Sequence, residues 1–210
     1  MDQVCVLLHG IKCDPASRLW NEEFSACYQS TTKTWLIPRK YGYVSGFSVW
    51  SSAYRRKQIV DHENLAFVGN PGKTSGLVEN ISGAKLSGVG HSLGGYILTA
   101  LLFRGSVKFH KLALLWSSSA EDFDWYAVQD CFDKIRVYWS ASDEILRTSQ
   151  PHEAANEPSQ LRLGLLGKAG PTILHPHVEA IKSDWLHNQF MDKTDEADKM
   201  VRDMFHWIDN

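Results

Sequence analysis

The sequence lacks any apolar run that approaches the roughly 20 residues of a membrane-spanning helix, so we expect no membrane span. It also lacks the basic region that begins a secretory signal peptide, because Met1-Asp2-Gln3 leads directly into the short apolar run Val4–Leu8. Cysteine is scarce, and its spacing matches neither C-x-x-C nor a set of zinc ligands. The four cysteines are Cys5, Cys13, Cys27 and Cys131. We therefore expect free thiols and a cytoplasmic protein.

An excess of charge of one sign is lacking as well. The formal net charge is −2, and 22% of the residues are charged, which argues against a nucleic-acid partner and against a polybasic membrane surface. The chain has no internal repeat. Its 210 residues suffice for one full-sized domain and are too few for two, so we expect a single domain over residues 1–210.

Short apolar runs alternate along the chain with stretches of helical periodicity. The expected strands are Val4–Leu8, Tyr43–Val49, Lys85–Val89, Lys111–Trp116, Ile135–Trp139 and Val178–Ile181, and the expected helices are Arg18–Tyr28, Ala53–Phe67, Leu93–Phe103, Leu186–Met191 and Glu196–Ile208. This alternation predicts an α/β fold, a doubly wound and mostly parallel sheet of about six strands with helices on both faces. Ligands bind such a sheet beyond the carboxyl ends of its strands.

The segment Gly90-His91-Ser92-Leu93-Gly94-Gly95 has the pattern G-x-S-x-G. It follows an expected strand and precedes an expected helix, which is the context that makes the pattern informative. A serine hydroxyl becomes a useful nucleophile when a sharp turn projects it toward a base. The chain passes so close to itself there that only small residues fit at Gly90 and Gly94. The helix that follows directs its positive end toward the site.

Other polar residues follow other expected strands. His9-Gly10-Ile11 follows the first, Asp143 and Glu144 follow the fifth, and His187 follows the last. Serine, acid and histidine thus occur in the chain order of the α/β hydrolases. The sequence resembles that superfamily over nearly its whole length, most clearly at residues 6–11 and 88–95, and is similar to small esterase- and lipase-type members without a lid domain.

The resemblance implies a nucleophile at Ser92, an acid at Asp143 and a base at His187, whose ring would have to reach both other side chains. It also implies an oxyanion hole formed by the backbone N–H groups of Ile11 and Leu93. Each such donor is typically worth about 3 kcal/mol of transition-state stabilisation. Asp143 and His187 are 44 residues apart, which is long for the family. The intervening insertion, residues 149–172, is expected to line or cover the site.

Alternatives remain open for two of the three residues. Asp143 is also a typical helix N-cap, with Glu144 as a neighbouring acid and Asp122 or Asp124 as more distant ones. The chain has nine histidines, and His177 is the second candidate for the base. His175 and His177, however, precede the last expected strand, at the end of the sheet away from the site.

Neither a cofactor nor a metal site is predicted. Gly72-Lys73-Thr74 resembles the end of a phosphate-binding loop, but Phe67 stands where that motif needs an earlier glycine. His175-x-His177 has no Cys or acidic partner at a supporting spacing.

The sequence therefore predicts a serine hydrolase that cleaves carboxylic esters through an acyl-enzyme on Ser92, with a small-molecule ester or acyl substrate. The same residues also serve thioesterases, amidases and acyltransferases. A non-catalytic binding protein with a hydrolase-like fold is the alternative from a different class, because fold does not fix function. The short chain leaves little room for a lid, so we expect an open site and small or exposed substrates.

Overall fold

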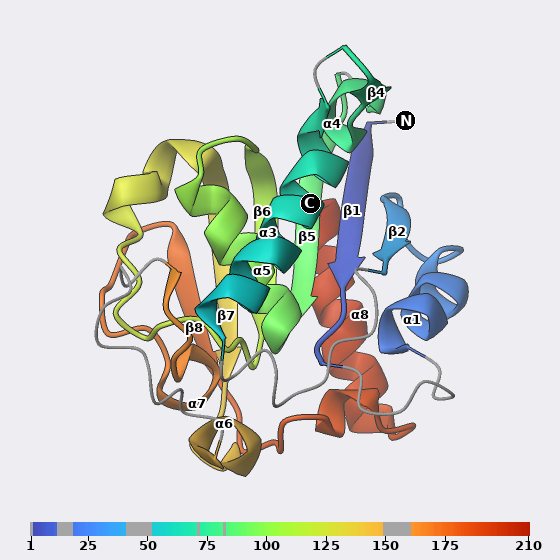
Figure 1. The fold of residues 1–210 in the computed structure, drawn as a ribbon. Coiled ribbons are helices and arrows are strands. Elements are labelled where there is room, and N and C mark those ends of the chain that lie inside the picture. The colour runs from blue at the N-terminus through green and yellow to red at the C-terminus, as the bar shows by residue number, and fades with distance from the viewer. Residues whose placement is uncertain (1, 12–18, 41–51, 71, 82, 149–160) are drawn as a thin grey trace.

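Six parallel strands form the central sheet of the protein. The structure, a computed structural model, describes residues 2–11, 19–40, 52–70, 72–81, 83–148 and 161–210. The strands follow the order β2-β1-β5-β6-β7-β8, and each neighbouring pair is parallel (Figure 1). Their bounds are Gln3–Leu8 for β1, Trp35–Arg39 for β2, Lys85–His91 for β5, Phe109–Leu115 for β6, Phe132–Trp139 for β7 and Val178–Lys182 for β8. The predicted α/β sheet is confirmed.

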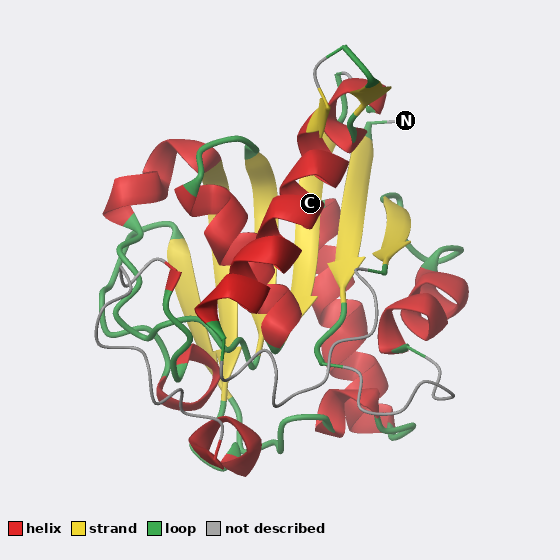
Figure 2. Cartoon of the chain, viewed as in Figure 1, coloured by secondary structure: helices red, strands yellow, loops and turns green. Residues whose placement is uncertain are grey.

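Helices cover both faces of this sheet (Figure 2). On one face lie α3 (Ala53–Val68) and α5 (Leu93–Phe103), whose apolar side chains share a core with those of β5 and β6. On the other face lie α1 (Trp20–Tyr28) and α8 (Asp195–Asp209), which enclose a second apolar cluster. Because its inner strands are buried on both faces, their sequences are continuous apolar runs rather than alternating ones.

Shorter elements connect the main ones. They are the hairpin strands β3 (Gly69–Asn70) and β4 (Thr74–Ser75), the helices α4 (Leu77–Asn80), α6 (Glu144–Thr148) and α7 (Leu166–Ala169), and the 3₁₀ helices η1 (Tyr126–Cys131) and η4 (Gln189–Met191). Serine and threonine begin two of the long helices. The Ser52 hydroxyl accepts a hydrogen bond from Arg55 N at the start of α3, and the Thr194 hydroxyl accepts one from Ala197 N at the start of α8.

Two elements differ from the sequence-based expectation. The strand next to β1 is Trp35–Arg39, whereas the strand predicted at 43–49 lies outside the described residues. Pro38 lies within β2, which is tolerated because β2 is an edge strand of the sheet. The helix predicted over 186–191 is wrong, since only the 3₁₀ turn Gln189–Met191 forms. There the Gln189 side chain accepts a hydrogen bond from Leu186 N, which holds the preceding residues in a loop.

The insertion between the predicted acid and base is tied to the sheet where the structure describes it. Gly164 N donates to Ser118 O, Gly167 N donates to Ser117 O, and Ser140 N donates to Gly167 O. This segment therefore lies against the loops that follow β6 and β7, at the carboxyl edge of the sheet. A Cβ on Gly167 would lie 2.2 Å from the Trp116 carbonyl carbon, so the close approach requires glycine.

Within the described residues, Cys5, Cys27 and Cys131 are free thiols, and Cys13 lies outside them. No helix in this part of the chain is long and apolar enough to cross a membrane.

Candidate active site

Ser92 occupies a strained turn between β5 and α5. Its φ is 53° and its ψ is −116°, a conformation that residues with a Cβ rarely adopt and that costs about 1–3 kcal/mol. The residue is 5% exposed. A strand that stops and a helix that starts at the same residue produce this turn, as the sequence pattern predicts.

The glycines beside Ser92 allow the chain to pass close to itself. A Cβ on Gly90 would lie 2.7 Å from the Gly94 carbonyl carbon, and a Cβ on Gly94 would lie 2.3 Å from Leu8 O. Both contacts are with backbone atoms, which cannot move aside. The expectation that only small residues fit at Gly90 and Gly94 is therefore confirmed.

Backbone hydrogen bonds from β6 and the loop after it hold both peptide groups of Ser92. Ser92 N donates to Leu115 O at 3.0 Å, and Ser118 N donates to Ser92 O at 3.1 Å. Between these two partners lies Trp116, which is fully buried and has a φ of 43°. Each of the neighbouring strands β5 and β6 is thus followed by a residue with a positive φ. The turn after β6 holds the turn that carries Ser92 through these two hydrogen bonds.

The loop after β1 runs directly beside Ser92. A Cβ on Gly10 would lie 3.0 Å from the Ser92 Cβ, which places the segment His9-Gly10-Ile11 against the serine. Leu93 is the first residue of α5, and the N–H groups of a first helical turn have no partner within the helix. The two groups predicted as oxyanion donors, the N–H groups of Ile11 and Leu93, therefore belong to segments that flank the serine.

Asp143 and His187 form a buried pair. His187 Nδ1 lies 2.7 Å from Asp143 Oδ2, and the side chains are 5% and 0% exposed. The other carboxylate oxygen, Oδ1, accepts a hydrogen bond from Leu146 N in the first turn of α6. Asp143 therefore caps a helix and contacts the histidine at once, one oxygen for each partner, so the two interpretations of this residue are compatible.

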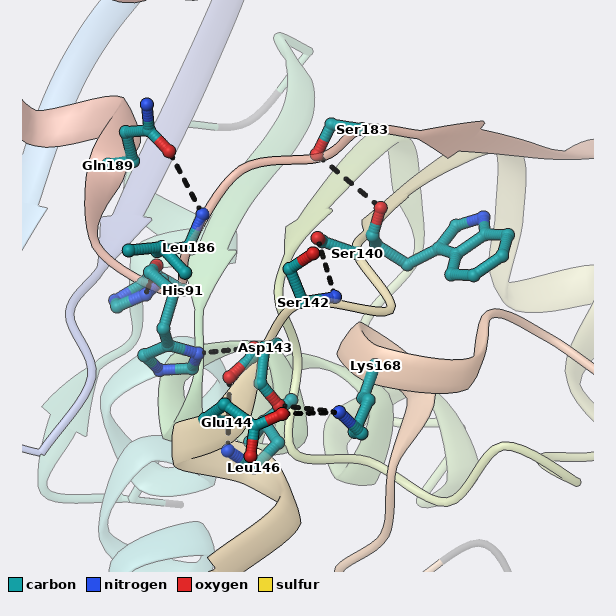
Figure 3. A network of polar contacts seen from close by, with 12 residues as sticks. His91, Ser140, Ser142, Asp143, Glu144, Leu146, Lys168, Ser183, Leu186 and Gln189 are labelled. Atoms are coloured by element: carbon teal, nitrogen blue, oxygen red, sulfur yellow. Dashed lines mark hydrogen bonds and ion pairs between the residues drawn. The ribbon is translucent and has the colours of Figure 1, made fainter.

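Lys168 from the insertion stabilises the loop that carries Asp143 (Figure 3). Its Nζ donates to Ala141 O at 2.8 Å and to Asp143 O at 3.1 Å, and it lies 3.6 Å from a carboxylate oxygen of Glu144. At the other end of the loop, Ser142 N donates to the Ser140 hydroxyl. The acid thus belongs to a loop whose backbone is bound on both sides.

His91, which precedes the serine, contacts the loop that carries His187. Its Nε2 lies 3.0 Å from His187 O, and the two imidazole rings are 4.6 Å apart. Burial, reinforced by the nearby His187, lowers the pKa of His91 well below its usual range, so its ring is neutral. From the sequence, which places His91 in the variable position of the serine turn, we expect it only to pack or to form a local hydrogen bond. The alternation of β5 was the available signal, since it places His91 on the same face as Val89.

The competing acids have other partners. Glu144 is exposed and faces Lys168. Asp122 pairs with Arg162 at 2.7 Å, and the Asp124 carboxylate accepts two backbone N–H bonds at the start of η1. None of these contacts involves a histidine, whereas Asp143 contacts His187 directly.

The second candidate for the base lies elsewhere in the sheet. His177 precedes β8, its carbonyl accepts a hydrogen bond from Ile135 N, and its ring lies 5.5 Å from that of His175. His175 in turn packs on Tyr126 and Phe132. Both residues lie at the amino end of the strands, opposite to the end that carries Ser92 and Asp143.

Two further features describe the surroundings of the pair. The His187 loop and the start of α6 line a pocket of about 520 Å³, with Ile145 and Leu186 as its apolar side chains.

No hydrogen bond joins the Ser92 hydroxyl to the His187 ring in the described part of the chain. Because Nδ1 contacts Asp143, Nε2 is the ring nitrogen left for a nucleophile, and catalytic hydrogen bonds are often long before substrate binds.

The motifs set aside in the sequence lie away from this edge. Lys73 belongs to the turn between β3 and β4, where its N–H donates to Asn70 O, at the end of the molecule that carries α4 (Figure 1). Among the described residues, no group of three or more His, Cys, Asp or Glu side chains is placed to hold a metal ion.

The sequence matches no family model and no curated protein. Solved structures are similar in fold. An uncharacterized protein from Bacillus cereus ATCC 10987 superposes with a TM-score of 0.58 at 14% identity over 99% of this chain, and this chain spans 59% of its length. A dienelactone hydrolase from Anabaena variabilis has a TM-score of 0.57 at 10% identity, over 98% of this chain and 85% of that one. A hormone-sensitive lipase from a metagenome library has a TM-score of 0.54 at 14% identity, over 98% and 77%.

Proposed function

We propose that this chain, which has the α/β-hydrolase fold, is a serine hydrolase that cleaves carboxylic esters of small molecules. The observation that carries the proposal is the buried Asp143–His187 pair at the same edge of the sheet as Ser92 in its strained turn. A histidine ring that is oriented by a carboxylate and lies near a strained serine is the arrangement that activates a hydroxyl nucleophile.

In the proposed reaction the Ser92 hydroxyl attacks the ester carbonyl carbon while His187 Nε2 takes its proton. His187 then donates that proton to the leaving alcohol as the bond from carbon to the alcohol oxygen breaks, which leaves an acyl group on Ser92. Water then attacks the acyl carbon while His187 takes its proton, and His187 returns that proton to Ser92 Oγ as the bond between the acyl carbon and Oγ breaks and the acid product leaves. Asp143 orients the His187 ring and stabilises the imidazolium.

The N–H groups of Ile11 and Leu93 would bind the oxyanion of the tetrahedral intermediate. Both are backbone donors on segments that flank Ser92, so they need no reorganisation during the reaction. Substituting either side chain would affect packing rather than the donor itself.

The similarity in fold to a hormone-sensitive lipase and to a dienelactone hydrolase supports an ester substrate for this chain. The pocket beside His187 has a volume of about 520 Å³, within the ordinary range for small-molecule sites, and Ile145 and Leu186 give it apolar surface that suits an acyl or alcohol group. Rates on p-nitrophenyl esters of increasing chain length test this. Short soluble esters are expected to react faster than long ones, and activity on long-chain emulsions alone would contradict the assignment.

A fluorophosphonate probe tests the nucleophile. It reacts with activated serines, so wild-type protein is expected to be labelled and Ser92→Ala unlabelled, whereas Ser142→Ala, which removes an exposed serine near the acid, is labelled like the wild type. A wild-type protein that resists labelling, or equal labelling of Ser92→Ala, would overturn the proposal.

One observation favours a second candidate, a binding protein on the same fold. The Ser92 hydroxyl and the His187 ring share no hydrogen bond in the described residues. A binding protein would resist the probe and hydrolyse no ester, thioester or amide. Thioesters and amides in the same assay also separate an esterase from enzymes that use the same three residues.

A further inference from the structure

His91 lies in an aromatic enclosure at the carboxyl end of β5. The residue is 4% exposed. The ring centroids of Phe190, His187 and Trp20 lie 4.9, 4.6 and 6.3 Å away. Phe190 belongs to η4, just beyond the loop of the base, and Trp20 begins α1. The ring of His91 is therefore confined from several directions and cannot rotate freely.

The hydrogen bond of His91 to His187 has a defined direction. A carbonyl oxygen only accepts, so the proton must be on His91 Nε2, which donates to His187 O at 3.0 Å. The neutral ring expected in this buried position has its single proton there. The bond joins residues 96 positions apart in the sequence and connects the strand that ends at the serine to the peptide of the histidine.

His187 is thereby held at two points. Asp143 contacts its ring at Nδ1, and His91 contacts its backbone carbonyl. The first contact sets the rotation of the ring and the second sets the position of the peptide from which the ring projects. Because His91 is the residue before Ser92, any shift of the His187 loop relative to β5 changes the separation of serine and base. Gly10 also lies against His91, since a Cβ added to Gly10 would lie 3.1 Å from His91 Nδ1.

We propose that His91 is a positioning residue, whose Nε2–H holds the backbone of His187 in register with the strand that carries Ser92. This inference rests on the proposed function for its catalytic consequence, but the geometry it assigns to His187 exists with or without catalysis. His91 itself touches no substrate in this proposal and exchanges no proton.

Two variants separate the donor from the ring. His91→Phe keeps an aromatic ring in the enclosure and removes the donor, whereas His91→Gln carries an amide N–H that reaches the position of Nε2. We expect kcat for a p-nitrophenyl ester to fall about 10²-fold in His91→Phe with KM unchanged, since a misplaced catalytic group has an effect of that size. His91→Gln is expected to recover most of this loss.

A third variant tests the reach of the donor. His91→Asn has the same amide on a shorter side chain, which ends short of the His187 carbonyl, so it is expected to behave like His91→Phe. Equal kcat in His91→Phe and wild type, or a His91→Gln as slow as His91→Asn, would overturn the proposal.

A measurement that needs no activity completes the test. A proton shared between an imidazole Nδ1–H and a carboxylate gives a low-field proton NMR signal, which Asp143→Asn assigns by abolishing it. We expect the signal in wild type and His91→Gln, and its shift or loss in His91→Phe. If the fluorophosphonate probe fails while this signal responds to His91→Phe, the proposed function falls and the positioning role stands. If esters are hydrolysed but neither the signal nor kcat changes in His91→Phe, the positioning role is overturned and the proposed function is not.

Discussion

Asp143 and His187 meet through a 2.7 Å contact between Oδ2 and Nδ1, although 44 residues separate them in the chain. They follow β7 and β8, which are neighbours in the sheet. The second carboxylate oxygen caps α6 through Leu146 N, so a single side chain fixes both the ring and the helix next to it. This division of the carboxylate between two partners makes the two roles separable by substitution.

Asp143→Asn is expected to lower kcat by up to about 10⁴-fold, because an amide no longer stabilises the imidazolium and favours the wrong tautomer. Asparagine caps helices as well as aspartate does, so the loss of stability should come from the altered contact with His187 and stay within about 1–3 kcal/mol. Ester hydrolysis and thermal unfolding measure the two quantities. Asp130→Asn, which alters an exposed carboxylate in η1, serves as the control and should leave both unchanged. A hydrolysis rate for Asp143→Asn within tenfold of the wild type would contradict the assignment.

Lys168→Met is expected to destabilise the protein by about 1.5–3 kcal/mol, because a charged donor to two carbonyl oxygens is lost while the apolar part of the side chain remains. The Lys168 side chain is 19% exposed, so solvent screens these bonds only partly. Chemical unfolding monitored by tryptophan fluorescence measures the change. Lys108→Met removes an exposed partner of Asp133 and should change stability by less than about 0.5 kcal/mol. Equal effects of the two substitutions would show that Lys168 does not stabilise the acid loop.

Ser92→Gly is expected to be more stable than Ser92→Ala by about 1 kcal/mol. Both variants lack the hydroxyl, but at a φ of 53° only glycine avoids the strain of a Cβ. Thermal unfolding of the two proteins measures the difference. Ser142, which has no left-handed φ, provides the matched pair, and there glycine should be the less stable variant. The same order at both positions would argue against strain at Ser92.

The buried His91 should make stability fall as the pH falls. Its pKa is lowered in the folded protein, with His187 and His9 as the titratable groups that contribute after burial, whereas in the unfolded chain its pKa is near the usual value of about 6.5. The unfolded state therefore binds the extra proton first below about pH 6.5. The free energy of unfolding is expected to fall by up to about 1.4 kcal/mol per pH unit there.

Urea unfolding of wild type and His91→Gln at about pH 7, 6 and 5 measures this slope. The variant should be less sensitive to pH, although His175, whose pKa is also lowered by burial, keeps a contribution of the same sign. Identical slopes for the two proteins would show that His91 is not kept neutral by the fold.

Much of this organisation is readable from local patterns. The turn at Ser92 follows from sterics within a few residues. A strand ends and a helix begins there, and the close approach at Gly90 and Gly94 restricts the backbone conformation of the serine. The inner strands are readable for the same reason, because strands buried on both faces must be apolar throughout. The edge strand β2 was missed because Pro38 interrupts its pattern, and edge strands tolerate what central ones do not.

Contacts between residues distant in the chain cannot be predicted from such local patterns. The chain has nine histidines and several acids, and the sheet order brings His187, rather than His177, beside Asp143. The contact of His91 with His187 O likewise depends on how a loop folds back over β5. The catalytic roles of Ser92, Asp143 and His187 stay predictions. Sterics along a few residues shape the turn of the nucleophile, whereas its partners depend on contacts between segments that only the packed sheet brings together.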